Sequence, residues 1–199
     1  VLLLDSGDTI QGSPTQALAF AGRAGDGPDP IIRAMNRVGY DAMAVGNHEF
    51  DFGVERLEKS RREARFPWLS ANTLRANGDP AFDPYVVREI AGVRVGVLGL
   101  VTPRVGDWES PSLLAGLRFS DTIEAARRYV PVLRGKERCD LVVVITHQGF
   151  ERDPATGRST GGSQENQAYA LATEVPGIDL LLAGHAHVVV EPRRLGSTW

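Results

Sequence analysis

The sequence predicts an α/β fold, in which short buried strands alternate with amphipathic helices. Short continuous apolar runs, such as residues 1–4 and the β-branched residues 141–145, are typical of strands buried on both faces of a parallel sheet. Between such runs, apolar residues recur at helical spacing, as in residues 30–39. The 199 residues suit one domain, residues 1–199, and 42% hydrophobic content is enough for a sizeable core.

The N-terminal half begins with a strand at residues 1–4 and a loop rich in Gly, Pro and Ala, with at most one helical turn around residues 14–21. Pro30 suits the first turn of the next helix, which Gly39 ends. A second helix is stopped by Pro67. The elements expected here are the helices 30–39 and 54–65 and the strands 1–4, 42–45 and 68–72.

The C-terminal half begins with a polar loop at residues 73–84 and a hairpin that turns at Ala91-Gly92. Residues 107–117 are expected to be irregular. Asp121 and Glu124 have capping-box spacing at the start of a helix, and Pro131 predicts a kink or break inside it. The elements expected here are the helices 121–135 and 164–174, the strands 85–90, 93–101, 141–145 and 178–183, and a polar loop at 151–162.

Polar side chains follow four of these strands at the point where each one ends. All four histidines of the chain occupy such positions. In an open α/β sheet the carboxyl ends of strands meet at one crevice, so we expect these side chains to lie together. For any one of them a hydrogen-bonded turn residue is the alternative, for example Asn47 as a helix cap. The residues are Asp5, Asp8, Asn47, His48, His147, His185 and His187.

Imidazoles, a carboxylate and an amide oxygen would form a mixed N/O site for a divalent metal ion. This set suits Zn, Mn, Fe or Co rather than Ca, and the absence of Cys ligands argues against a closed structural zinc site. Two ions sharing one carboxylate, for which Asp8 is the candidate, would clamp a phosphate and activate a water. The metals would also let a chain of formal charge -3 hold an anion.

Composition excludes several other classes of function. A pI near 5.8 and scattered Lys and Arg residues predict no nucleic-acid polymer and no membrane surface as partner. No apolar run approaches the roughly 18 residues that span a bilayer. The single Cys139 has no neighbouring His or Cys, so we expect a packed thiol rather than a nucleophile.

The motifs Gly7-Asp8, Gly46-Asn47-His48-Glu49, His147 and Gly184-His185-Ala186-His187, in this order, resemble the later signature blocks of the calcineurin-like metallophosphoesterases. More narrowly, residues 4–14 and 46–53 resemble the catalytic domain of bacterial 5'-nucleotidases and 2',3'-cyclic-nucleotide 2'-phosphodiesterase/3'-nucleotidases. Trp108 and Glu165-Asn166 favour the cyclic phosphodiesterase branch, whereas Asp51 is typical of 5'-nucleotidases. The resemblance implies a layered sandwich of mixed β-sheets flanked by helices.

The resemblance also implies roles. Asp8 would bridge two divalent metals, and His48 would be the catalytic histidine, oriented and charged by Asp51, that assists a metal-activated hydroxide. Asp5 and Glu49 are expected to be structural rather than ligands. The other metal ligands would be Asn47, His147 and His185 at one site and His187 at the other.

Two parts of the family's pattern have no match here. The first motif, Asp-x-His, should lie before Val1, and the C-terminal nucleotide-binding domain should follow Trp199, so we expect a truncated catalytic domain. The resemblance implies a periplasmic, secreted or cell-surface location. It implies hydrolysis of phosphate esters of nucleotides. The alternatives are a metal-binding fragment or interaction module without turnover, and the same fold acting on a sugar-nucleotide or a sulfur ester.

Overall fold

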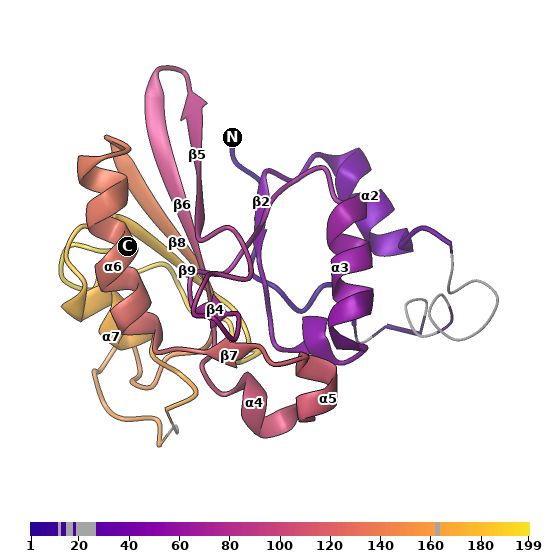
Figure 1. Ribbon diagram of the computed structural model, residues 1–199. Helices are drawn as coiled ribbons and strands as arrows, with labels where there is room; N and C mark the ends of the chain where they lie inside the picture. The colour runs from indigo at the N-terminus through magenta and orange to yellow at the C-terminus, as the bar shows by residue number, and fades with distance from the viewer. Residues whose placement is uncertain (12, 15–17, 19–26, 162–163) are drawn as a thin grey trace.

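The computed structural model describes residues 1–11, 13–14, 18, 27–161 and 164–199. Its layers run from helices, through two β-sheets, to helices again (Figure 1). The helices are α2 (Pro30–Val38), η2 (His48–Phe50, a 3-10 helix), α3 (Gly53–Glu63), α4 (Val105–Trp108), α5 (Pro111–Leu114), α6 (Thr122–Gly135) and α7 (Ala168–Glu174). The strands are β1 (Leu4–Asp5), β2 (Ala42–Ala44), β3 (Trp68–Leu69), β4 (Thr73–Leu74), β5 (Tyr85–Ile90), β6 (Val93–Val101), β7 (Arg118–Phe119), β8 (Leu141–His147) and β9 (Leu180–Ala183).

The strands that lead into the predicted site belong to two different sheets. Strands β1, β2 and β3 form a parallel sheet in that order. Strands β5, β6, β8 and β9 form the second sheet, in which the β5–β6 hairpin is antiparallel and β6, β8 and β9 run parallel. The predicted sandwich of mixed sheets flanked by helices is therefore confirmed. Asp8, His147 and His185 lie together although they follow strands of two different sheets.

The two sheets pack closely through a core of small and β-branched side chains. Ala42 and Ala44 of the first sheet meet Val97 and Ile145 of the second, and all four are at most 1% exposed. Close approach depends on Gly99, because a Cβ there would lie 2.3 Å from the Cβ of Leu69. The outer faces of the sheets are covered by α2 and α3 on one side and by α6 and α7 on the other (Figure 1).

Helix boundaries follow from capping chemistry that the sequence displays. The Asp29 side chain accepts hydrogen bonds from the backbone N–H groups of Ile31 and Ile32, and Gly39 ends α2 with a left-handed φ of 89°. Asp121 caps α6 by accepting from the N–H of Glu124. Of the predicted kink or break at Pro131, the break is wrong, because α6 continues through this residue, and the kink stays a prediction. Pro131 is exposed, so the carbonyl that loses its partner can be hydrated.

Several expected segments differ in extent. Residues 107–117, expected to be irregular, include the end of α4 and all of α5. The first two residues of the expected polar loop, Thr73–Leu74, form β4 and pair with β7. Helix α7 begins at Ala168, later than expected, and β1 is shorter because only Leu4 and Asp5 pair with β2. The helical turn expected at residues 14–21 falls mostly outside the described residues. Within the described ranges, no helix combines the length and apolar content that crossing a membrane requires.

Candidate metal centre

The loop after β1 holds Asp8 in an unusual backbone conformation. Gly7 has a φ of 95° and Asp8 a φ of 62°, a left-handed conformation that few residues other than glycine adopt. The Asp5 carboxylate stabilises this turn, since its Oδ1 accepts from Gly7 N and Thr9 Oγ1, each at 2.8 Å. Asp5 is therefore a turn residue, as expected from the sequence.

Glu49 ties this loop to the segment that follows β2. Its side chain is fully buried and accepts from the backbone N–H groups of Asp8 at 2.8 Å and Thr9 at 2.5 Å. It also accepts from Ile10 N at 3.2 Å and Gly46 N at 2.6 Å. Gly46 has no room for a side chain, because a Cβ would lie 2.3 Å from Asp8 Oδ1. Glu49 is thus a structural carboxylate, which is the role expected for it.

Asp8 contacts both of the sheets. Its Oδ1 accepts from the backbone N–H of His48 at 2.9 Å, and its Oδ2 lies 2.9 Å from Nε2 of His147 at the end of β8. The other ring nitrogen of His147, Nδ1, lies 2.6 Å from the carbonyl oxygen of Ser6. Because Nδ1 donates to that carbonyl in the neutral ring, the lone pair of Nε2 is directed toward Asp8.

One buried polar atom near Asp8, Oδ1 of Asn47, lacks a hydrogen-bond partner within the described part of the chain. Nε2 of His147 meets the Asp8 carboxylate at 2.9 Å as an ion pair. Asn47 is 5% exposed and His147 is 2% exposed. Leaving the Asn47 oxygen unpaired costs about 1–3 kcal/mol. A divalent cation would satisfy an amide oxygen and an imidazole lone pair together, so the residues fit a metal ion.

His185 completes the group from the loop after β9. One ligand atom each from Asp8, His147 and His185 lie within 4.8 Å of one another. The His185 ring packs 5.1 Å from the His147 ring and 5.7 Å from the Trp108 ring, measured between centroids. Its Nε2 lies 2.6 Å from Oε1 of Glu165. From the sequence, Glu165 and Trp108 were predicted only as markers of a family branch, because no local pattern pairs them with His185.

Two other predicted residues lie outside this ligand group. His187 is exposed and stands on the same loop, so its role as a ligand stays a prediction. His48 follows Asn47 with an exposed ring whose Nδ1 lies 3.0 Å from Oδ2 of Asp51. This His48–Asp51 pair is the one that the resemblance implied, and its ring remains available to a ligand.

The charges in the site oppose the effect of burial on protonation. Burial disfavours the ionised carboxylate of Asp8, but contacts with His147 and the His48 N–H hold the pKa of Asp8 below its usual range. Burial likewise disfavours a charged His147 ring, yet Asp8 raises the pKa of His147. Burial and then the charge of Asp8 raise the pKa of Glu49. Without a cation, Asp8 and His147 thus favour an ion pair, and metal binding must displace a proton.

Burial and neighbouring charges also have opposite effects on the pKa of the exposed His48. Partial burial lowers the pKa of His48, but the hydrogen bond to Asp51 and the charges of Asp8, Asp51 and Glu49 outweigh it and raise the pKa of His48 above its usual value. Glu109 lies beside Asp51, and burial together with this carboxylate raises the pKa of Glu109. The His48 ring therefore keeps its proton to a higher pH than a free histidine ring does.

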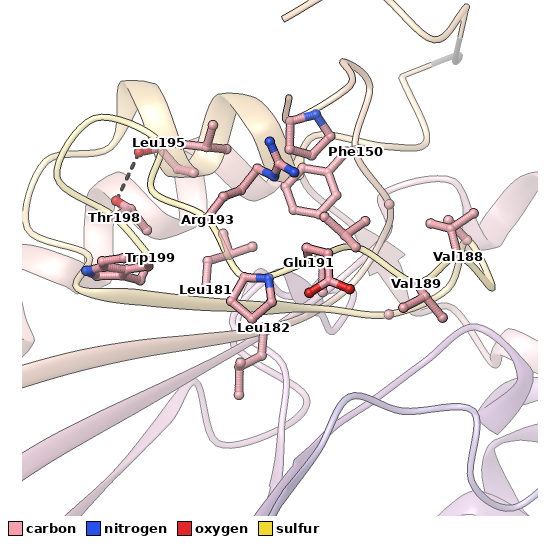
Figure 2. A pocket seen from close by; sticks show the side chains of 18 of the residues that line it. Phe150, Leu181, Leu182, Val188, Val189, Glu191, Arg193, Leu195, Thr198 and Trp199 are labelled. Carbon is pink, nitrogen blue, oxygen red and sulfur yellow. Dashed lines mark hydrogen bonds between the residues drawn. The ribbon is translucent and has the colours of Figure 1, made fainter. Parts of the chain in front are cut away.

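An apolar cavity of about 660 Å³ adjoins the centre on the β9 side. Figure 2 shows Phe150, Leu181 and Leu195 among the side chains that line it, with Trp199 at one end. The lining includes His185 and His187, so the cavity reaches the loop that carries them. It contains one acidic and one basic side chain, Glu191 and Arg193, besides these histidines.

Comparison with known proteins identifies several relatives of this chain. A family model described as bacterial capsule synthesis protein PGA_cap matches residues 16–197. A 2',3'-cyclic-nucleotide 2'-phosphodiesterase/3'-nucleotidase of Salmonella typhimurium is 36% identical over 94% of this chain and 30% of its own length. A 5'-nucleotidase of Vibrio cholerae is 35% identical over 94% of this chain and 32% of its own length.

Among solved structures, the calcineurin-like phosphoesterase YfkN from Bacillus subtilis matches 94% of this chain and 58% of its own chain. The TM-score is 0.82 at 33% sequence identity. This chain therefore spans about a third of the length of the curated relatives that it matches. The family model begins after Asp8, whereas these two relatives and this solved structure each cover 94% of the chain.

Proposed function

Since this chain belongs to the PGA_cap family and is a calcineurin-like metallophosphoesterase, as its motifs predicted, we propose that it hydrolyses phosphate esters of nucleotides with divalent metal ions. The observation that carries the proposal is the meeting of Asp8, His147 and His185, from three different strand ends, beside the unpartnered oxygen of Asn47. Structural packing alone does not require an unpaired amide oxygen at a buried position.

The proposal assigns the metal ligands as follows. Asp8, with a carboxylate that faces both sheets, would be shared by two ions, and Asn47, His147 and His185 would complete one of the two sites. His187 would belong to the other. Such ions, which could be Mn, Zn, Fe or Co, supply positive charge for the phosphate and lower the pKa of a coordinated water. They would hold an anion on a chain whose formal charge is -3.

His48 is proposed as the group that holds a proton for the leaving oxygen. Its backbone N–H is bonded to Asp8 at 2.9 Å, so its ring starts from a fixed position beside the centre. The ring lies outside the group of potential ligands, and Asp51 orients it through Nδ1. Because its pKa is raised, the ring is more often protonated near neutral pH than a free histidine and can act as a general acid.

The substrate class and the location come from the relatives and the resemblance. The relatives are named for nucleotide monoesters and cyclic nucleotides, which supports a nucleotide as the substrate here. An extracytoplasmic location, periplasmic, secreted or at the cell surface, is proposed from the resemblance alone. Within the described residues, Trp108 is an exposed aromatic ring beside His185 that could contact the organic part of such a substrate.

A comparison of two variants with the parent chain tests the proposal. We expect hydrolysis of bis-p-nitrophenyl phosphate, of a 2',3'-cyclic nucleotide or of a 5'-nucleotide to depend on added Mn²⁺ or Zn²⁺. His48→Ala should lower turnover by about 10²–10⁴-fold while metal binding, measured by calorimetry, is retained. Asp8→Asn should lose both metal binding and turnover.

The outcomes separate the proposal from its alternative. Metal binding without hydrolysis of any of these esters would favour a metal-binding fragment or interaction module. Turnover that is equal in His48→Ala and the parent would remove His48 from the mechanism. Hydrolysis that persists in the presence of a strong chelator would contradict the metal centre itself.

A further inference from the structure

Glu165 lies just before α7 and reaches the loop that follows β9. Its Oε1 is 2.6 Å from Nε2 of His185, and the two side chains are 30% and 13% exposed. The backbone oxygen of Glu165 accepts from Oγ1 of the buried Thr102 at 2.9 Å. Glu165 is therefore anchored at the end of β6 while its carboxylate contacts a candidate ligand on a neighbouring strand end.

The contact with Glu165 involves Nε2 of His185 and leaves Nδ1 available to a metal ion. No oxygen of Glu165 belongs to the group of potential ligands, although His185 does, among the described residues. Glu165 thus touches the histidine from outside that group. A neutral imidazole has one N–H donor and one lone pair, so a carboxylate that accepts from Nε2–H leaves the lone pair on Nδ1.

His147 shows the same arrangement with a different acceptor. Its outer nitrogen, Nδ1, lies 2.6 Å from the carbonyl oxygen of Ser6, and its inner nitrogen, Nε2, faces Asp8. The ring of His185 contacts the His147 ring edge-on and the Trp108 ring at a tilt of 34°, and these contacts restrict how far it can turn. Each histidine thus has one nitrogen held by an acceptor outside the group of potential ligands, a backbone carbonyl for His147 and a carboxylate for His185.

We propose that Glu165 is a positioning residue for the metal centre, which accepts the Nε2–H of His185 and directs the lone pair of Nδ1 toward the cation. The carboxylate would fix the tautomer and the ring angle and make His185 a more basic ligand. This inference rests on the proposed metal centre but not on turnover, because it concerns metal affinity and the state of one imidazole ring.

The test uses the whole chain and two substitutions, Glu165→Ala and Glu165→Gln. Calorimetric titration with Mn²⁺ should show about 10–100-fold weaker binding for Glu165→Ala. The loss should be smaller for Glu165→Gln, because the amide oxygen can still accept the proton. In the metal-free protein, ring ¹⁵N shifts should show the Nε2–H tautomer of His185 in the parent and a mixture of tautomers in Glu165→Ala.

Glu151→Gln is the matched control. Glu151 accepts hydrogen bonds from the backbone N–H groups of Tyr169 and Ala170 in α7, at 3.0 and 2.8 Å. The Glu151→Gln substitution removes one negative charge, as Glu165→Gln does, and perturbs the start of α7. Among the described contacts, Glu151 has none with a histidine. The metal affinity of this variant should match that of the parent. An equal loss in the control would show that the effect comes from the helix rather than from His185, and would overturn the inference.

The remaining outcomes distinguish this inference from the proposed function. Unchanged Mn²⁺ affinity in Glu165→Ala, or an unchanged tautomer, would overturn the role of Glu165 while leaving the hydrolase proposal in place. A parent chain that binds Mn²⁺ tightly but hydrolyses no ester would contradict the proposed function, and the effect of Glu165 on affinity would still stand. A parent chain that binds no Mn²⁺ would overturn both.

Discussion

The two sheets support the candidate metal centre in different ways. On the β1–β2 side, the buried Glu49 carboxylate accepts hydrogen bonds from four backbone N–H groups. These bonds hold the loop that carries Asp8 against Gly46. On the β9 side, the loop 184–187 is largely exposed, and Ala186 N bonds to Gly184 O within the same turn. The first side is preorganised by the fold, whereas the second depends on the contact between His185 and Glu165.

This difference matters because ligands that are already held in place lose less entropy when a cation binds. Asp8 and His147 each contact the backbone of a distant segment, Asp8 the N–H of His48 and His147 the carbonyl of Ser6, so their positions follow from the folding of both sheets. His185 and His187 both have left-handed φ angles, 69° and 52°, on a turn in which His185 is half-buried and His187 is exposed. Damage to the first side should therefore affect both folding and metal binding, and damage to the second should affect metal binding alone.

The largest effect is expected from Gly46→Ala. A Cβ at this position would lie 2.5 Å from Asp8 N and 2.8 Å from Glu49 Oε2, both of which are fixed by other hydrogen bonds. We expect about 3 kcal/mol of lost stability, near the upper end for overpacking, together with loss of Mn²⁺ binding. Chemical denaturation and calorimetric titration measure the two effects.

Gly135→Ala is the matched control for this substitution. It lies at the end of α6, where a Cβ would meet nothing within 4 Å. Alanine is favoured over glycine in a helix, so this variant should be as stable as the parent or slightly more stable. If Gly46→Ala retained both the stability and the metal affinity of the parent, the β1–β2 side would not be preorganised in the way described.

A smaller effect is expected from Glu49→Gln. The amide would place N–H donors against backbone N–H groups that now bond to a carboxylate, so we expect about 2 kcal/mol of lost stability. Amide hydrogen exchange should accelerate at Asp8, Thr9, Ile10 and Gly46. Exchange at Gly184, whose N–H bonds to Thr146 O, should not change. Acceleration of equal size on both sides would mean that the two sides unfold as one unit.

The parts of the fold that follow from local sequence were predictable. The β5–β6 hairpin was predicted from its turn, and both turn residues have the positive φ that tight hairpins require, 51° for Ala91 and 82° for Gly92. The start and the end of helix α2 were predicted from Pro30 and Gly39. Polar residues after buried strands pointed to the Asp8, His147 and His185 group, which the fold brings together.

Other features depend on pairings that no local pattern encodes. Strands β4 and β7 are two residues each and form only because distant segments meet, and α4 and α5 are too short to show helical periodicity. The division into two sheets depends on which apolar faces pack together, since all the strands share the same apolar character. The contact between Glu165 and His185 spans 20 residues and follows from the placement of β6, β9 and α7.

The smallest effect is expected from Asp51→Asn, which changes protonation with little effect on folding. Because Asp51 contributes to the raised pKa of His48, the asparagine should lower that pKa in the metal-free protein, as ¹H NMR titration of the ring would show. The His48–Asp51 pair stabilises the folded state below the usual histidine pKa of about 6.5. That contribution is lost as the pH rises through the raised pKa of the folded state.

The stability difference between the parent and Asp51→Asn should depend on pH, because protonation of His48 strengthens its pair with Asp51. His48 is 46% exposed, so the pair contributes less than about 1 kcal/mol. The parent should be more stable than Asp51→Asn at pH 5, and the two should converge by pH 8. Asp107→Asn, which removes an exposed aspartate paired with Arg104, should leave the His48 titration unchanged. If the pKa of His48 is the same in Asp51→Asn and the parent, Asp51 does not charge the ring, and the other carboxylates, Asp8 and Glu49, hold its proton instead.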